Sequence, residues 1–321
     1  MALHSPLLHR LDAIASRQWE LYRFALPSRE GLVVCIEGKW GEISPLKGRS
    51  KETLQEAEAQ LKHYLESGEK TDFFPSVQFG LESVFEEGHF PLQVPLYALC
   101  QGTPEEVLRE ADIALGKGHT TLKIKVGLFG VQDNQFVIKQ LLQKCRLRVD
   151  CNRNFSFAQA MNLFAPFDPA LFDYIEDPTY EEESLPQFTH PFALDENVEK
   201  AFTSSRSTYP SLTGIILKPT LLGGKKGCRR FIHYAQQHGL KITLSSCFES
   251  SLGLLQIVKL AHHFNLTKFP LGLDTRRYLN GDIVDSSPRF DLPTMRCNEE
   301  LMVLKEHLQK VAHGTTPLSP I

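Results

Sequence analysis

The sequence predicts an α/β fold in which a closed TIM-type barrel of parallel strands, (β/α)7β in type, carries a smaller α+β domain over one end. The first observation is a series of short apolar runs after about residue 95, separated by helix-like stretches. Their spacing is roughly 20 to 30 residues, the length of a strand plus a crossover helix. The second observation is that residues 1–92 mix strands, turns and a helix instead. We therefore expect a capping domain over residues 1–92, completed by residues 285–321, and a barrel over residues 93–284.

The N-terminal part is expected to contain two strands and a helix. Leu21 to Ala25 and Leu32 to Glu37 have the pattern of strands on either side of a turn at Pro27 to Gly31. Ser50 precedes a charged segment, Lys51 to Leu65, whose apolar residues recur at helical spacing. This pattern predicts an amphipathic helix with Ser50 as its cap.

Eight apolar runs define the expected barrel strands. Eight strand-and-helix repeats favour a closed barrel over an open doubly wound sheet, and no GxGxxG follows any run to support the open sheet. The runs are Pro95 to Cys100, Leu122 to Gly127, Leu147 to Asn152, Phe172 to Asp177, Phe192 to Glu196, Gly214 to Lys218, Lys241 to Ser246 and a weak one near Gly272.

Composition limits the partners that the chain could have. Hydrophobic residues make up 42% and charged residues 23%, and the formal net charge of -3 lacks the basic excess of a nucleic-acid-binding protein. No apolar stretch approaches the ~18 residues of a membrane span, and the N-terminus lacks the apolar region of a secretory signal. The seven cysteines form no CxxC pair, which predicts reduced thiols in a cytoplasmic protein. The densest basic run, Gly223 to Arg230, is expected to be a loop leading into an exposed helix face.

Three carboxylates end successive apolar runs: Asp150, Glu176 and Asp195. Residues at the C-terminal ends of barrel strands face the active site, and successive strand ends lie side by side. Three converging carboxylates repel one another unless a cation lies between them. Oxygen ligands favour a hard divalent ion, so we expect Mg²⁺, with Mn²⁺ as a substitute. The alternative is that each carboxylate only caps the helix that follows it.

Three lysines also lie near strand ends. Lys123 and Lys125 are two residues apart, so both point to the same side of one strand. Crowded and buried ammonium groups have a lowered pKa, and a neutral amine near pH 7 is a general base. Lys218 ends a strand roughly opposite in barrel order and would approach a substrate from the other face. The alternative for the first pair is a polar edge strand facing solvent, which fits a central barrel strand poorly.

These groups together are what removal of a proton next to a carboxylate requires. A metal ion neutralises the charge that develops on the substrate carboxylate, and one lysine removes the adjacent proton to give an enediolate. The sequence therefore predicts a metal-dependent enzyme that acts on a small carboxylate.

Five short motifs in order resemble the enolase superfamily, in its muconate lactonizing enzyme subgroup. The N-terminal stretches Gly41 to Thr53 and Pro75 to Ser83 resemble the capping domain of that superfamily. The resemblance covers most of the chain and implies an enolase-like fold. The motifs are TLKIKVG at Thr121 to Gly127, RVDCN at Arg148 to Asn152, IEDP at Ile175 to Pro178, ALDE at Ala193 to Glu196 and LKP at Leu217 to Pro219.

Within the superfamily, the stretches Ser245 to Gly253 and Gly272 to Thr275 are most similar to the o-succinylbenzoate synthase family. That family dehydrates 2-succinyl-6-hydroxy-2,4-cyclohexadiene-1-carboxylate to o-succinylbenzoate, a step in menaquinone or phylloquinone synthesis. The resemblance implies three Mg²⁺ ligands, which are Asp150, Glu176 and Asp195. It implies roles for three lysines, with Lys125 as the base in a syn dehydration, Lys123 as a stabiliser of the enediolate and Lys218 as a cation–π partner over the opposite face. It also implies that Arg148 and Asn152 orient the substrate or metal-bound water, and that Ser245, Ser246 and Gly272 bind near the succinyl tail of the substrate.

Two other functions stay open. Lys125 and Lys218 on opposite faces are also the two bases that a racemase uses. An N-succinylamino acid or dipeptide racemase or epimerase of the same superfamily would therefore need the same residues. A non-catalytic relative that keeps the barrel as a binding scaffold is the second alternative, and the presence of every expected ligand and base argues against it. Substrate choice is expected to depend on cap loops before Gly31 and near Gly48.

Overall fold

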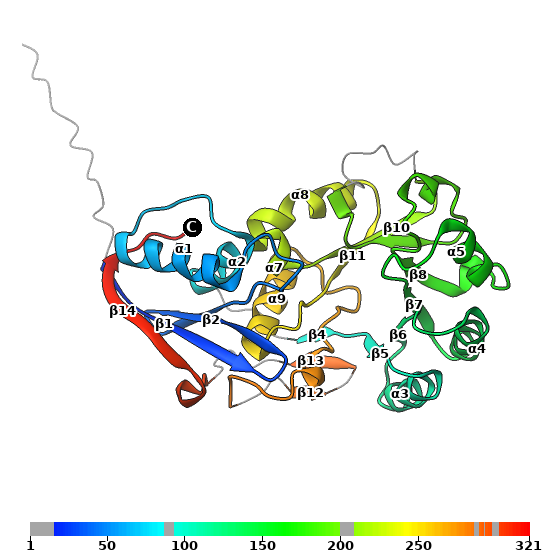
Figure 1. The fold of residues 1–321 in the computed structure, drawn as a ribbon, viewed down its shortest axis with the longest axis horizontal. Coiled ribbons are helices and arrows are strands. Elements are labelled where there is room, and N and C mark those ends of the chain that lie inside the picture. The colour runs from blue at the N-terminus through cyan, green and yellow to red at the C-terminus, as the bar shows by residue number, and fades with distance from the viewer. Residues whose placement is uncertain (1–15, 87–92, 200–208, 286–288, 292, 297–301) are drawn as a thin grey trace, which may run out of the picture.

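The structure is a computed structural model that describes residues 16–86, 93–199, 209–285, 289–291, 293–296 and 302–321. Figure 1 shows one lobe built from the N-terminal strands and the C-terminal strand, and a second lobe built from parallel strands with their helices. Among these residues, no helix combines the length and the apolar character needed to cross a membrane.

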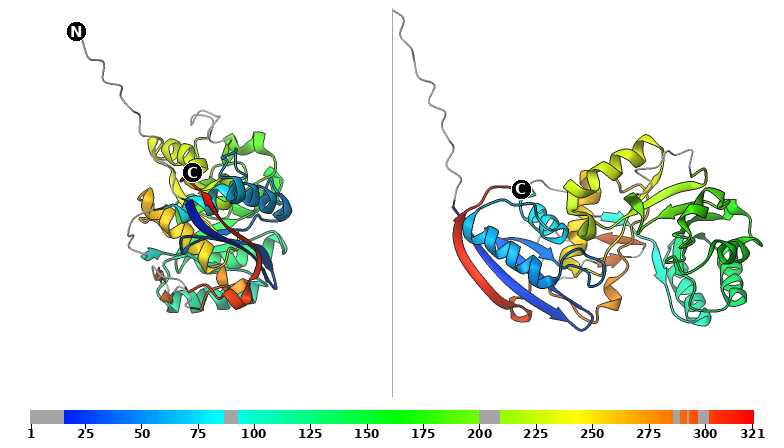
Figure 2. Two further views of the ribbon diagram at one scale, coloured as in Figure 1. Left: turned by 90° about the vertical axis from the view of Figure 1, so that its left-hand side faces the viewer. Right: turned by 45° about the horizontal axis from the view of Figure 1, so that its top comes forward.

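A four-stranded antiparallel sheet, in the order β14–β1–β2–β3, forms the capping lobe. Three of its strands are consecutive: β1 (Ser16–Leu26), β2 (Arg29–Ile36) and β3 (Lys39–Ile43). The fourth, β14 (Gln309–Pro317), comes from the end of the chain and lies along β1 in both views of Figure 2. Both strands expected from the sequence are confirmed, and each is longer than its apolar run.

Two helices, α1 (Leu54–Ser67) and α2 (Pro75–Val84), cover one face of this sheet. The prediction that Ser50 caps α1 is wrong. Thr53 is the cap: its hydroxyl accepts a hydrogen bond from the backbone N of Glu56 at 3.2 Å, and the Glu56 carboxylate accepts one from the backbone N of Thr53 at 2.8 Å. The Ser50 hydroxyl instead accepts from the backbone N of Leu46 at 2.8 Å and so closes the preceding turn.

Seven parallel strands form the barrel sheet, in the order β11–β10–β9–β8–β7–β6–β5. The chain at Leu271 and Gly272 closes it, because Leu271 bridges to Leu96 and Gly272 bridges to Ser245. The weak eighth run near Gly272 is thereby confirmed as the closing segment, and the barrel fold predicted from the sequence is confirmed. The strands are β5 (Ala98–Cys100), β6 (Thr121–Lys125), β7 (Arg146–Asp150), β8 (Phe172–Glu176), β9 (Phe192–Leu194), β10 (Leu212–Leu217) and β11 (Lys241–Leu244).

The described crossover helices lie outside the strands and bury their apolar stripes against them. The basic run Gly223 to Arg230 is helical almost from its start, since α8 begins at Gly224. The helices are α3 (Pro104–Gly116), α4 (Val131–Leu142), α5 (Phe157–Phe164), α7 (Pro219–Leu222), α8 (Gly224–Gln237) and α9 (Ser251–His263).

A small third sheet lies between the lobes and bears on the domain boundaries. It has the order β12–β13–β4, with β4 (Gln93–Pro95), β12 (Arg289–Asp291) and β13 (Thr294–Arg296). Of the described segment after residue 284, β14 pairs with the capping sheet, whereas β12 and β13 pair with the strand that leads into the barrel. We propose boundaries near residues 92 and 284, with β12 and β13 assigned to the barrel side.

Helix α2 packs directly on β3 at two glycines, Gly41 and Gly80. A Cβ at Gly41 would overlap the carbonyl oxygen of Gly80, and a Cβ at Gly80 would lie 2.7 Å from the carbonyl oxygen of Glu42. Backbone meets backbone here, so neither side can move away by changing a rotamer.

Gly80→Ala is therefore expected to lower the free energy of unfolding by ~1–3 kcal/mol, as overpacking does in a tight core. Chemical denaturation measures this change. Gly116→Ala is the matched control, because Gly116 also lies in a helix and a Cβ there meets nothing within 4 Å. The control should be neutral or stabilising by ~0.4–1 kcal/mol. Equal losses in the two variants would contradict the close approach.

Candidate active site

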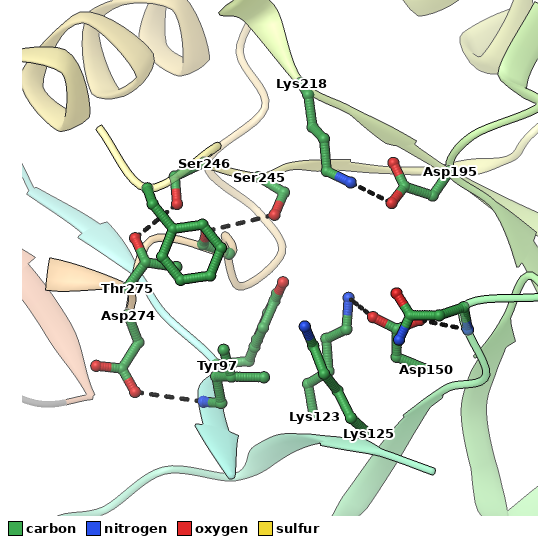
Figure 3. Close-up of a pocket in the computed structure, with 14 residues that line it drawn as sticks. Tyr97, Lys123, Lys125, Asp150, Asp195, Lys218, Ser245, Ser246, Asp274 and Thr275 are labelled. Atoms are coloured by element: carbon green, nitrogen blue, oxygen red, sulfur yellow. Dashed lines mark hydrogen bonds and ion pairs between the residues drawn. The ribbon is translucent and has the colours of Figure 1, made fainter. Parts of the chain in front are cut away.

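A pocket of about 500 Å³, its open mouth included, lies at the C-terminal ends of the barrel strands (Figure 3). Most of the residues singled out from the sequence line it. The lining residues are Tyr97, Leu99, Lys123, Lys125, Asp150, Asn152, Asp195, Lys218, Ser245, Ser246, Phe248, Gly272, Asp274 and Thr275.

The strand register explains why distant residues meet here. Lys125 pairs with Asp150, and Asp150 pairs with Glu176, so these three lie side by side on β6, β7 and β8. Two residues earlier on β6 and β7, nearer the N-terminal ends of these strands, Lys123 pairs with Arg148. Residues two apart on a strand point to the same face, which places both layers inside the barrel.

Lys123 bridges two of the carboxylates. Its Nζ lies 2.7 Å from Glu176 Oε1 and 2.9 Å from Asp150 Oδ2, and all three side chains are buried. Burial alone would lower the pKa of Lys123, but the charges of Asp150 and Glu176 raise it well above its ordinary value. The expectation that crowding lowers the pKa of Lys123 is therefore wrong. The two carboxylates therefore hold Lys123 in its protonated form.

Lys218 pairs with the third carboxylate. Its Nζ donates a hydrogen bond to Asp195 Oδ2, and the charge of Asp195 raises the pKa of Lys218 against the opposing effect of burial. Figure 3 shows Lys218 entering the pocket from the side opposite Lys123 and Lys125.

Lys125 differs from the other two lysines. It is half-buried in the pocket wall, beside Asp150 in the strand register. Its Nζ makes neither a hydrogen bond nor an ion pair with any residue that the structure describes. Lys125 is thus the lysine whose amine is available to a substrate.

The carboxylate set has the chemistry of a divalent cation site, although in the described part of the chain no three metal-binding side chains converge in this structure. Glu176 is buried, and its Oε2 lacks a hydrogen-bond partner. Burial and the charges of Asp150 and Asp195 raise the pKa of Glu176. A buried carboxylate oxygen without a partner, next to two further carboxylates, fits a hard cation bound through oxygen.

Asp177 ties the end of β8 to the segment after β9. Its carboxylate accepts hydrogen bonds from the backbone N of Asp195 at 3.2 Å and of Glu196 at 3.0 Å. Burial and the neighbouring Asp195 raise the pKa of Asp177 to about 7. Asp177 thus fixes the backbone that presents Asp195.

The other end of the pocket is lined by hydroxyl groups and a glycine. Ser246 Oγ and Thr275 Oγ1 are 2.6 Å apart, and the Ser245 hydroxyl lies 3.5 Å from the carbonyl oxygen of Gly272. A Cβ at Gly272 would overlap the Tyr97 hydroxyl and lie 2.8 Å from Ser245 Oγ. Gly272 therefore makes room for the Tyr97 hydroxyl.

Arg148 and Asn152 were both expected to contact substrate or metal-bound water. Asn152 lines the pocket, and its backbone N donates to Asp150 Oδ1 at 3.0 Å. Arg148 lies below the pocket: its Nε donates to Asp173 Oδ2 at 2.8 Å, and its guanidinium stacks between the Tyr97 and Tyr174 rings at 4.8 Å from each. In this structure it supports Tyr97 from beneath.

Five lining residues did not come from the sequence reasoning. Asp274 and Thr275 belong to the stretch Gly272 to Thr275, and Phe248 belongs to Ser245 to Gly253. Both stretches were predicted to contribute to the site, and both line the pocket. Tyr97 and Leu99 lie on an apolar run with no charged end to mark it. Pairing of β5 with β6, where Leu99 lies opposite Lys123, and closure of the barrel at Leu271 bring that run to the site.

Sequence comparisons place the chain among known proteins. A family described as "Enolase C-terminal domain-like" matches residues 106–300, and one described as "MenC, N-terminal domain" matches residues 20–87. The o-succinylbenzoate synthase of Yersinia pseudotuberculosis is 33% identical, over 85% of this chain and 94% of that protein. The o-succinylbenzoate synthase of Haemophilus influenzae is 29% identical, over 90% of this chain and 99% of that protein.

Solved structures share the fold. A dipeptide epimerase from Enterococcus faecalis superposes with a TM-score of 0.73 at 16% identity, covering 92% of this chain and 99% of that one. An o-succinylbenzoate synthase from Thermosynechococcus elongatus, solved with Mg in its active site, gives a TM-score of 0.67 at 23% identity, covering 91% and 98%. These likenesses confirm the enolase-like fold. Together with the sequence matches, they show that the chain belongs to the o-succinylbenzoate synthase family of the enolase superfamily, a family of hydro-lyases.

Proposed function

We propose that this chain dehydrates 2-succinyl-6-hydroxy-2,4-cyclohexadiene-1-carboxylate to o-succinylbenzoate in menaquinone or phylloquinone biosynthesis. The observation that carries the proposal is the unequal state of the three pocket lysines. Lys123 and Lys218 are held as cations by carboxylates, whereas Lys125 is free of ion pairs among the described residues. Lys125 is therefore the group that removes the proton next to the substrate carboxylate and returns it to the departing hydroxyl on the same face.

The remaining charged groups stabilise the negative charge that this proton transfer creates. Lys123 would place its ammonium group beside the reacting carboxylate, and Lys218, which enters from the opposite side of the pocket, would place a second one over the other face of the substrate ring. Asp150, Glu176 and Asp195 would hold Mg²⁺, or Mn²⁺ in its place, which supplies positive charge to the substrate carboxylate when it is bound. The serine hydroxyls, Asn152 and Gly272 are proposed to receive the rest of the substrate.

An N-succinylamino acid or dipeptide racemase or epimerase is the second candidate. It is favoured by the opposed positions of Lys125 and Lys218 and by the likeness to a dipeptide epimerase fold. Its chemistry requires both lysines to exchange protons. The ion pair with Asp195 keeps Lys218 protonated, which suits a fixed cation in the dehydration and also the proton donor of a racemase in one direction, so turnover of the two substrates separates the candidates.

We propose the cytoplasm as the compartment. The cysteines at residues 35, 100, 145, 151, 228 and 247 all carry free thiols, and burial raises the pKa of each, which makes the reactive thiolate scarce. Cys297 lies outside the described residues.

We propose a small-molecule carboxylate as the binding partner of this chain.

Removal of the divalent metal is expected to abolish dehydration, and added Mg²⁺ should restore it. Asp195→Asn should weaken metal binding without unfolding the chain, because Asp195 faces a polar pocket and not the core. Activity assays with and without chelator, and titration of Mg²⁺ into the variant, measure both effects. Asp112→Asn, at an exposed carboxylate paired with Lys144, should behave as the parent chain. Full turnover in excess chelator would overturn the metal assignment.

Substitutions of Lys125 and Lys218 are expected to lower turnover in different ways. Lys125→Ala should lower turnover by ~10²–10⁴-fold and stop exchange of the α-proton with deuterated solvent, because the base is gone. Lys218→Ala should lose ~0.5–2 kcal/mol of transition-state stabilisation if cation–π contact is its role, and Lys218→Arg should recover part of it. Steady-state kinetics and NMR of the exchanged proton measure these losses.

Lys144→Ala, on an exposed lysine far from the pocket, is the control for loss of a surface charge. Near-normal dehydration by Lys125→Ala together with an inactive Lys218→Ala would exchange the two roles. Racemisation of N-succinylamino acids that is lost in both alanine variants would instead favour the second candidate.

A further inference from the structure

Helix α9 begins against a carboxylate of the capping lobe. Glu42, on β3, is buried, and its Oε2 accepts hydrogen bonds from Ser250 Oγ and from the backbone N of Gly253, the latter at 2.9 Å. Its Oε1 accepts from the backbone N of Ser250 at 3.2 Å. The backbone N of Glu42 donates in turn to Gln256 Oε1 at 2.5 Å. The side chain of Glu42 therefore binds the first turn of α9, and its backbone N binds Gln256 in the second turn.

Helix α8 begins against a second carboxylate of the same lobe. Glu82, on α2, accepts hydrogen bonds from the backbone N of Lys225 at 2.5 Å and of Lys226 at 3.1 Å. Gln78 Nε2, one turn earlier on α2, donates to Glu82 Oε1 at 2.9 Å and orients it. The N-terminal amides of a helix have no hydrogen-bond partner within the helix and carry partial positive charge. A carboxylate accepts their hydrogen bonds and also stabilises that charge.

Both contacts need glycines at the helix starts. A Cβ at Gly253 would lie 2.9 Å from Glu42 Oε2 and would also overlap the Glu249 side chain. A Cβ at Gly224, where φ is +62°, would overlap Glu82 Oε2. The basic run Gly223 to Arg230 thus contains the surface that receives Glu82.

These two helices directly follow the loops that carry pocket residues. Lys218 precedes α7, which leads into α8, and Ser245 and Ser246 precede α9 by a few residues. Glu249 joins the two loops, since its carboxylate accepts from Thr220 Oγ1 and from the backbone N of Cys247, the latter at 2.6 Å. The loops are therefore anchored at their far ends by the capping lobe and to each other in the middle.

We propose that Glu42 and Glu82 are positioning residues, which set the places of Ser246 and Lys218 by capping the barrel helices that follow them. The capping lobe is then part of the rigid frame of the site. The inference rests on the proposed function only for its kinetic readout.

The test measures dehydration by Glu82→Gln and Glu42→Gln, each alone and combined with Lys218→Ala or Ser246→Ala. A glutamine keeps the size of the side chain but turns one acceptor into a donor that faces a backbone N–H. Each single variant should lose about twofold to thirtyfold in kcat/KM, which is no more than the loss expected on removing the side chain that it positions. If Glu82 acts through Lys218, Glu82→Gln should cost nothing further in the Lys218→Ala background, and Glu42→Gln should likewise be silent in the Ser246→Ala background.

Amide hydrogen exchange of the same variants gives a readout that is independent of activity. Residues 219–230 should exchange faster in Glu82→Gln, and residues 245–256 should do so in Glu42→Gln. Glu58→Gln is the control, because Glu58 is a capping-lobe carboxylate that pairs with Arg23 at 2.6 Å within the lobe. Should Glu82→Gln fail to fold, Gln78→Met removes only the donor that orients Glu82 and should show the same pattern more weakly.

Unchanged kcat/KM in the single variants, or losses that multiply in the lysine and serine backgrounds, would overturn the positioning role. A parent chain that does not dehydrate the cyclohexadiene substrate would instead overturn the proposed function. In that case, α-proton exchange of a carboxylate substrate replaces dehydration in the same set of double variants, so the two failures are told apart.

Discussion

Buried carboxylates that cannot be left without positive charge are the constraint on which this site depends. Parallel register brings Asp150 beside Glu176, and the Asp177 carboxylate holds the backbone of Asp195 close to both. The cost of burying such charges is several kcal/mol per ion unless each is paired. Lys123 and Lys218 provide that pairing and become fixed cations by doing so. The carboxylates beside Lys123 and Lys218 therefore keep these two lysines protonated even when no substrate is bound.

Much of this arrangement could be predicted from the sequence, because two geometric rules apply strictly to the parallel strands of a barrel. Strand residues two apart share a face, and parallel barrel strands present their C-terminal ends at one mouth. Asp150 and Lys218 could be assigned to the pocket on that basis alone. The closing segment at Gly272 was also predictable, although it forms only bridges and no regular strand.

What could not be predicted depends on depth and on contacts between distant segments. Arg148 shares a face with Asp150, but a two-residue offset lowers it by one layer, where Asp173 and two tyrosine rings hold it. Tyr97 lies on a run with no charged residue at its end, and it reaches the pocket where β5 pairs with β6 and the barrel closes at Leu271. The predicted cap of α1, Ser50, is also wrong, because the reciprocal hydrogen bonds between Thr53 and Glu56 start the helix three residues later.

The pairing of β14 with β1 has a consequence for how the chain folds during synthesis. Trp19 lies opposite Gly314 in this pair, so nearly the whole chain separates the two partners. Until the ribosome has released the last strand, β1 presents an open edge that can pair with another chain. The barrel between them can form first, and the capping sheet is completed last. Contacts of such long sequence separation slow folding, so nascent chains of this protein are expected to depend on chaperones at that stage.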